Sequence, residues 1–333
     1  MKWIAIDIGN HEIKAAVRGI GNRPTKLLYD DCGKQFSYMP SAFYCINGNP
    51  VYAGNYTSVM GALHPENLIR LNSSSNKDIL LEGILKVIFD ATYQYYDDKT
   101  IGAVLLYEDL EDKMLSEMAR RIFTEVQCKC TSEVLSSVLF KEKGRTLVID
   151  ISMSALKISL VENDKKTSYS RFNEMGFHSV DISDIIGYAL TEKLSEVELF
   201  LHGELIDKVR AELCQGRFEI SSLDTLSTYQ NDANRIIKLF EDKMMKYLLG
   251  CFDVCTQNLK KLSLNWNDVN NIILCGGASN YHKMSETLIG YLRGCGLDAD
   301  TYNIKTYTKD AQWAAAFAAI QLPLVSDIVI VDF

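Results

Sequence analysis

The sequence predicts an α/β protein made of two lobes, and three observations lead to this prediction. Strand-like and helix-like segments alternate along most of the 333 residues, which is typical of layered α/β domains. The chain is about twice as long as a typical domain. A strand, a tight turn and a second strand occur at residues 3–17 and again at residues 146–162, so the two halves resemble diverged copies of one unit.

The opening stretch, WIAIDIGNHEIKAAV, predicts a β-hairpin whose turn carries an acid. An apolar run ends in Asp7, the chain passes through Gly9, Asn10 and His11, and a second alternating run begins at Ile13. Because glycine lacks a Cβ atom, backbone N–H groups beside Gly9 can approach a phosphate closely. The Asp7 carboxylate can hold a magnesium ion directly or through water. We therefore expect this turn to contact a phosphate and a metal ion.

The later stretch, TLVIDISMSALKISLVE, repeats this pattern, with Asp150 at the end of an apolar run and a second strand-like run after it. Two such hairpins facing each other across a cleft would form a two-sided clamp for phosphate and metal. Asp7 and Asp150 are therefore the expected metal ligands. For each aspartate, the alternative is an acid that only caps a turn at the end of a strand.

The remaining elements of the first half alternate between strands and helices. Short connections predict a meandering sheet near the start, and residues 78–96 carry apolar side chains at the spacing of one helix face. Residues 71–77 are polar and rich in serine, which is typical of a loop beside a cleft. We expect strands at residues 26–30, 38–46, 101–107 and 126–130, and helices at residues 55–70, 78–96, 108–125 and 132–140.

The second half contains a third glycine turn, Gly276-Gly277, between a buried strand and a helix. Ser279 is expected to cap that helix, so that backbone N–H groups and the helix dipole face an anion such as a nucleotide phosphate. The alternative is a turn that needs glycine only for packing. We expect further strands at residues 166–172, 199–202 and 269–274. Helices are expected at residues 181–192 and between residues 202 and about 262, and two more begin at residues 279 and 310.

Composition excludes several classes of protein. The chain is 47% hydrophobic and 23% charged, as in globular proteins, and its net charge of −8 argues against nonspecific nucleic-acid binding. It has no uncharged apolar run of 18 residues and no secretory signal, so we expect a cytoplasmic protein without a membrane partner. The nine cysteines are expected to be reduced and mostly buried. The pairs Cys128/Cys130 and Cys251/Cys255 lack the second pair or histidine of a zinc site.

Taken in order, these stretches resemble the nucleotide-binding domain of Hsp70 chaperones, a member of the actin, hexokinase and Hsp70 superfamily. Asp7-Ile8-Gly9 is similar to the first phosphate loop of that family, Asp150 to the start of the second, and Met175-Gly176 to a following glycine turn. The turn at Gly276 resembles the adenosine motif. The resemblance implies nucleotide contacts from Gly9, Asn10, His11, Ser152, Gly176, Gly276, Gly277, Ala278 and Ser279.

The resemblance also implies a two-lobed actin-like ATPase (ribonuclease H-like) fold with a nucleotide cleft between the lobes. The lobes are expected at residues 1–144 and 145–322, and residues 323–333 resemble the acidic and aliphatic linker of the family. ATP or ADP with Mg²⁺ is the implied cofactor, and a protein client or co-chaperone is the implied partner. The apolar tail is a further candidate for self-association, although an ordinary final strand explains it equally well.

The departures from the family concern the second phosphate loop above all. Where the family has a glycine run, a threonine and a second aspartate, this chain reads Ser152, Met153, Ser154, Ala155 and Lys157. A positive φ costs a residue other than glycine roughly 1–2 kcal/mol, so the backbone conformation of the family's loop is disfavoured here, and the added side chains would also occupy the space of a phosphate. The window 70–74 lacks the family's catalytic lysine, Asn280 replaces an arginine that stacks on adenine, and Glu133 lies one position from the expected acid of the first connecting helix.

Two hypotheses follow. The first is an Hsp70-like nucleotide-binding module that binds ATP or ADP, hydrolyses it weakly or not at all, and acts through a partner or client, since the groups that position a phosphoryl group are missing. The alternative is an active ATPase of the chaperone or filament-forming actin-like type, in which Asp7 and Asp150 hold magnesium and Glu133 helps to order the attacking water. A small-molecule kinase ranks last, because no sugar-binding motif is found.

Overall fold

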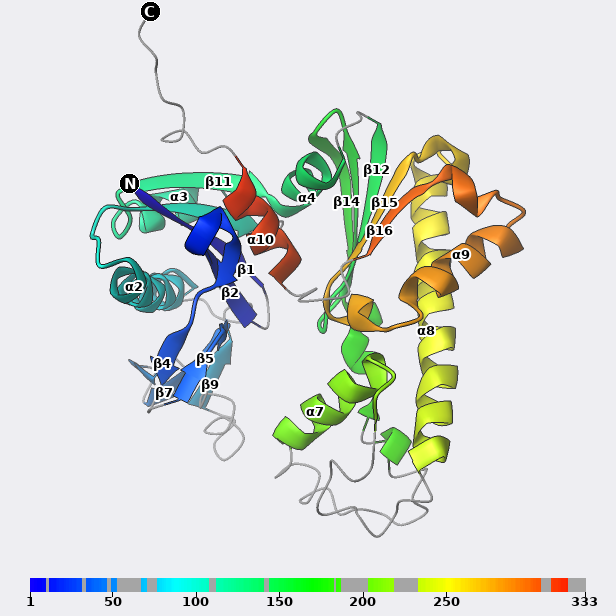
Figure 1. Ribbon diagram of the computed structural model, residues 1–333, viewed down its shortest axis with the longest axis horizontal. Helices are drawn as coiled ribbons and strands as arrows, with labels where there is room; N and C mark the ends of the chain where they lie inside the picture. The colour runs from blue at the N-terminus through cyan, green and yellow to red at the C-terminus, as the bar shows by residue number, and fades with distance from the viewer. Residues whose placement is uncertain are drawn as a thin grey trace, which may run out of the picture. The chain divides into compact units, whose positions relative to one another are not determined.

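The computed structural model describes residues 1–9, 12–31, 34–46, 49–52, 67–70, 77–107, 112–140, 144–182, 184–186, 203–218, 233–306 and 313–322. The chain forms two compact units. Unit 1 consists of Met1–Lys141 and Trp313–Phe333, and unit 2 consists of Glu142–Gln312. Each unit contains a sheet with both parallel and antiparallel strands, packed with helices (Figure 1). The prediction of an α/β protein is thereby confirmed.

Unit 1 is built on a six-stranded sheet in which five strands have the order β11-β10-β1-β2-β3, and β6 (Tyr38–Pro40) also pairs with β2. Strands β1, β2 and β3 are antiparallel neighbours, whereas β1, β10 and β11 run parallel. Residues 3–6 of the central strand β1 are all buried, because both faces of this strand are covered. The bounds are β1 Lys2–Ile8, β2 Glu12–Arg18, β3 Pro24–Lys26, β10 Ile101–Tyr107 and β11 Glu125–Cys130.

Unit 2 repeats this arrangement. Its five-stranded sheet has the order β14-β13-β12-β15-β16, with β12, β13 and β14 antiparallel and β12, β15 and β16 parallel. Read in chain order, the strands occupy the same places and directions as β1, β2, β3, β10 and β11. The two halves are therefore copies in topology, as the repeated hairpin pattern predicts. The bounds are β12 Arg145–Ile151, β13 Leu156–Glu162, β14 Lys165–Phe172, β15 Asn271–Cys275 and β16 Asn303–Thr306.

The helices of unit 1 cover its sheet with apolar faces. In α2, Leu81, Ile84, Leu85 and Ile88 are buried at the three- and four-residue spacing of one helix face. The short α10 packs on α4 and on β1, and its alanines permit this close approach. The bounds are α2 Lys77–Tyr96, α3 Asp112–Ala119, α4 Thr131–Leu139 and α10 Ala314–Gln321.

The position of α10 corrects one predicted boundary. The sequence places this helix in a second lobe at residues 145–322, but it belongs to unit 1 although it follows β16 of unit 2 in the chain. Arg18 of β2 fastens its carboxyl end, since the guanidinium Nε and Nη2 atoms donate to the carbonyl oxygens of Ile320 and Leu322 at 3.0 and 3.2 Å. A positive group at this end also complements the helix dipole.

Unit 2 is held together by the 29-residue helix α8 (Ala233–Lys261). One stripe of α8 is completely buried against the sheet core, with residues repeating every three or four positions. The stripe comprises Ile236, Phe240, Met244, Leu248, Cys251, Cys255 and Leu259. Helix α9 (Met284–Gly294) packs beside α8 and β16, and α7 (Gly203–Cys214) is a further helix of this unit (Figure 1).

Several predicted elements differ from the observed ones. Residues 68–70 form strand β9 instead of the end of a helix, and the helix predicted at 108–125 ends with α3 at Ala119, because the chain turns before β11 begins at Glu125. Strand β16 was not expected. The predicted segments 55–66, 187–192, 199–202 and 323–333 lie outside the described residues. The small strands are β4 Tyr29–Asp31, β5 Lys34–Phe36, β7 Ala42–Ile46, β8 Asn49–Tyr52 and β9 Leu68–Arg70.

Candidate functional site

The hairpin of β12 and β13 brings an acid and a base together at the end of the unit 2 sheet. Asp150 and Lys157 are direct cross-strand partners, so their side chains emerge on the same face. The Lys157 Nζ atom lies 3.4 Å from Asp150 Oδ2. The side chains of Lys157 and Asp150 are only 17% and 25% exposed, so this ion pair is shielded from water more than a surface pair would be.

The turn of this hairpin closes without glycine. The backbone N–H and the hydroxyl of Ser152 both donate to the carbonyl oxygen of Ala155, at 3.0 and 2.9 Å. None of the four residues from Ser152 to Ala155 has a positive φ. The turn therefore avoids the positive φ angles that would be costly without glycine and uses ordinary conformations that any residue adopts.

A second loop covers the turn. The backbone N–H groups of Phe177 and His178 donate to the carbonyl oxygens of Ser152 and Met153, at 2.9 and 3.1 Å. A Cβ atom at Gly176 would lie 2.5 Å from the Met153 carbonyl oxygen, so no other residue fits there without displacing the turn. Because Gly176 lacks a Cβ atom, the two backbones can lie in close contact at this point.

A third loop covers the acid itself. Gly276 follows β15 with φ 86°, a conformation that favours glycine. A Cβ atom here would lie 2.3 Å from Asp150 Oδ1 and 2.6 Å from the carbonyl group of Ile151. The structure therefore brings together Asp150, Ser152, Gly176 and Gly276, which the sequence singled out, with Gly277 directly beside them. We call residues 150–157, 175–178 and 276–277 the loop cluster.

The residues after Gly276 do not form the predicted capped helix. Gly277–Asn280 is a single 3₁₀ turn (η8), and α9 begins only at Met284. The Ser279 hydroxyl donates back to the Gly276 carbonyl oxygen at 2.8 Å, and Ser279 is fully buried together with Ala278. The prediction that Ser279 caps a helix is wrong, since its hydroxyl closes the turn behind it. Gly277 remains partly exposed, and a Cβ atom there would meet only Phe177 Cδ1, at 4.0 Å.

Tyr247 of α8 supports the loop cluster from the core, and sequence reasoning missed it. Its hydroxyl donates to the Met175 carbonyl oxygen at 2.9 Å, and its ring stacks on Phe177 with 6.2 Å between centroids. Burial, followed by the neighbouring Cys251, raises the pKa of Tyr247 well above its ordinary value, so the hydroxyl stays a donor. A position about 100 residues away from the hairpin gives no sequence signal of this contact.

The hairpin of β1 and β2 in unit 1 has the same charge arrangement. Lys14 is the direct cross-strand partner of Asp7, so the spacing of six intervening residues between acid and lysine occurs in both hairpins. This repeated spacing in the sequence could have predicted that each lysine lies beside its aspartate. The Gly9 carbonyl oxygen accepts a hydrogen bond from the buried Ser41 hydroxyl.

Three further predicted site residues belong to unit 1. Glu133 lies in the first turn of α4 and is partly exposed. Asn10 and His11 lie outside the described residues. Unit 1 thus places Asp7 near the end of β1, Gly9 directly after this strand, and Glu133 on a separate helix.

The donor set at Asp150 does not fit the expected magnesium ion. Lys157 already pairs with one carboxylate oxygen, and the Gly276 backbone lies close against the other. Across the described ranges, no group of three or more histidine, cysteine, aspartate or glutamate side chains could hold a metal ion. Mg²⁺ prefers six oxygen ligands, usually including several waters, and an ammonium group beside the carboxylate opposes a second cation.

Comparison with known proteins names no family. No protein-family model matches this chain, and a search of curated proteins finds no match. Among the helices that the structure describes, none combines the length and apolar character needed to cross a membrane. Any function must therefore be argued from the geometry of the two units.

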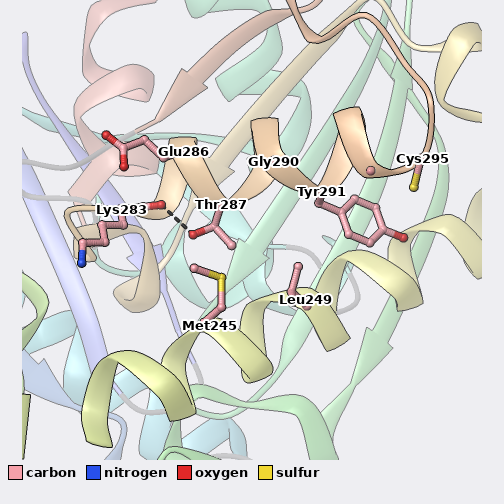
Figure 2. Close-up of a pocket in the computed structure, with 9 residues that line it drawn as sticks. Met245, Leu249, Lys283, Glu286, Thr287, Gly290, Tyr291 and Cys295 are labelled. Atoms are coloured by element: carbon pink, nitrogen blue, oxygen red, sulfur yellow. Dashed lines mark hydrogen bonds between the residues drawn. The ribbon is translucent and has the colours of Figure 1, made fainter. Parts of the chain in front are cut away.

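A separate groove lies between α8 and α9 in unit 2 (Figure 2). Its volume is about 470 Å³, and Met245 and Leu249 of α8 face Thr287 and Gly290 of α9 across it. The Thr287 hydroxyl is occupied, since it donates to the Lys283 carbonyl oxygen at 2.8 Å. The groove is mostly apolar and contains none of the residues that the sequence singled out.

Proposed function

We propose that the chain is a nucleotide-binding protein of the actin-like (ribonuclease H-like) type, related to the Hsp70 nucleotide-binding domain. In this proposal it binds ATP or ADP with weak or absent hydrolysis and acts through a protein client or partner. The loops around Asp7 and Asp150 are the segments that contact phosphate. The observation that carries the proposal is the duplicated topology, in which each copy places an aspartate–lysine pair at the same place in its first hairpin.

The duplicated topology supports the two-lobed fold, because two sheets with one strand order and one set of directions are what an internally repeated α/β protein requires. In both copies the acid lies near the carboxyl end of the central strand, beside a parallel neighbour. Ligands of α/β sheets bind outside these strand ends. The position of Asp7 and Asp150 therefore agrees with a ligand site.

The chemistry of the loop cluster supports binding of an anion. The largely buried Lys157 carries its ammonium group beside Asp150, and the Gly276 backbone lies close to the same carboxylate. Gly277 is partly exposed and leaves open space for a ligand. Hydrolysis also needs a group that orients the attacking water. Asp150 is a poor candidate for that role, since Lys157 and the Gly276 backbone already engage it.

Titration calorimetry of the purified protein with ATP and ADP tests the proposal. Gly277→Asp places a negative charge in the open space of the loop cluster, and we expect it to weaken binding at least about tenfold through charge repulsion. Gly290→Asp adds the same charge at an exposed position of α9, where an added Cβ atom would have no other atom within 4 Å, and it should leave binding unchanged. Circular dichroism checks that both variants fold.

Two results would contradict parts of the proposal. A wild-type protein that binds neither nucleotide would remove the function itself, and equal affinity of wild type and Gly277→Asp would place binding elsewhere. Phosphate release measured on the same samples separates the two hypotheses from the sequence. Steady turnover would favour the active ATPase over the binding module.

A further inference from the structure

We infer that the Lys157 ammonium group takes the place of the divalent cation at Asp150, so that the loop cluster binds phosphate groups without metal. The inference rests on the proposed nucleotide binding and specifies its chemistry. It starts from a disagreement: the resemblance implies Mg²⁺ beside Asp150, and the residues around this carboxylate do not accommodate it.

The ion pair gives the first part of the argument. Lys157 Nζ lies 3.4 Å from Asp150 Oδ2, and both side chains are more than two thirds buried. The pairing is built into the sheet, because the two residues are cross-strand partners next to the turn. The register places the two side chains next to each other on one face, so Lys157 reaches the acid from the neighbouring strand.

The second part is the space around the acid. The Gly276 backbone approaches Asp150 so closely that a Cβ atom would lie 2.3 Å from Oδ1. With Lys157 on Oδ2, both carboxylate oxygens have close neighbours. A magnesium ion that keeps several of its waters needs room beside a carboxylate, and it would bring two further positive charges next to the ammonium group.

The third part is chemical equivalence. In phosphate sites, a cation bridges protein carboxylates and the oxygens of the phosphate, which would otherwise repel each other. An ammonium group carries three N–H donors and can bond a carboxylate and a phosphate oxygen together. Unit 1 repeats the arrangement, since Lys14 lies directly opposite Asp7. Both hairpins thus place a lysine directly opposite the acid, and in unit 2 this lysine supplies the balancing charge.

Calorimetric titration with ATP in two buffers tests the inference, one with millimolar Mg²⁺ and one with excess EDTA. We expect the wild-type dissociation constants in the two buffers to agree within about threefold. Lys157→Met should weaken binding in EDTA at least tenfold. The control Lys165→Met removes an exposed lysine from β14 of the same sheet and should bind as the wild type does in both buffers.

Each outcome decides between the two proposals. Wild-type binding that is lost in EDTA overturns the metal-free site and leaves the nucleotide function standing, whereas no binding in either buffer removes both. A second test, which needs no lysine variant, uses electron paramagnetic resonance to measure whether the nucleotide-free protein binds Mn²⁺. Mn²⁺ bound by the wild type and released in Asp150→Asn would also overturn the inference, and we expect none to bind at this carboxylate.

Discussion

The two hairpins of this protein reach similar geometry by different means. The hairpin of unit 1 carries Gly9 in its own turn, and a buried side chain, Ser41, satisfies the carbonyl oxygen of that glycine. The hairpin of unit 2 has no glycine in its turn, and neighbouring backbones cover it at Gly176 and Gly276. In unit 2, glycine is needed where two backbones meet, whereas in unit 1 a side chain contacts the glycine.

This difference changes how the missing glycines are interpreted. Judged by its turn alone, the second hairpin looks like a damaged phosphate loop. The structure instead shows an unstrained turn whose carbonyl oxygens accept hydrogen bonds from Phe177 and His178. The turn is therefore supported by backbone hydrogen bonds from residues 177 and 178, and Lys157 places a positive charge beside Asp150.

The largest expected effect is a difference between the two units in how much stability each loses as the pH rises. Burial raises the pKa of Cys214 and of Cys251 in unit 2 to about 12, and it raises the pKa of Cys255 well above the ordinary value. An unfolded thiol ionises near pH 9. The native state keeps these protons, so the stability is fully present below pH 9 and falls between pH 9 and 12, by about 1.4 kcal/mol per pH unit for each thiol.

Burial also raises the pKa of Cys45 in unit 1, but unit 2 contributes the three strongly shifted thiols named above, and we therefore expect unit 2 to unfold first as the pH rises. Short pulses with a protease that is active at alkaline pH, followed by mass spectrometry, locate the first cleavage. Cleavage that begins in unit 1 would contradict this prediction. Cys214→Ala removes one titrating thiol and should reduce the pH slope by about 1.4 kcal/mol per unit.

A smaller effect tests whether glycine is required at position 276 because of the close contact with Asp150 or only because of its positive φ. Gly276 and Gly296 both have positive φ, 86° and 78°, but only Gly276 has close neighbours. Gly296→Ala should cost about 1 kcal/mol of unfolding free energy from backbone strain. Gly276→Ala adds overlap with Asp150 and Ile151 and should cost about 3 kcal/mol or more. Urea denaturation gives both values, and equal losses would show that the contact with Asp150 is unimportant.

The smallest effect compares the hydroxyl groups in the two turns. Ser41 is buried and donates to Gly9, so Ser41→Ala should lower the free energy of unfolding by about 1 kcal/mol. In unit 2, the backbone N–H of Ser152 donates to the same carbonyl oxygen as its hydroxyl. Ser152→Ala should therefore cost no more than about 0.5 kcal/mol. A larger loss for Ser152→Ala in urea denaturation would reverse the comparison.

Local patterns predicted much of the fold. The strand at residues 101–107 and the helix at residues 78–96 agree with β10 and α2 within one residue, because their apolar spacing leaves little choice. The helix expected at Ser279 failed for a local reason, since a serine hydroxyl can close a turn behind it as easily as it can cap a helix. The alanine-rich α10 was predicted as a helix but assigned to the second lobe, whereas it belongs to unit 1.

By itself, the sequence determined the α/β class, the repeated hairpins and the acids at their strand ends, because these follow from side-chain periodicity and from glycine and turn chemistry. Only the tertiary structure decided what surrounds each acid. The contacts of Gly276 with Asp150, and of Tyr247 with Met175, join segments about 70 to 130 residues apart. Such contacts depend on how sheets and helices pack, and packing leaves no periodic trace in the chain.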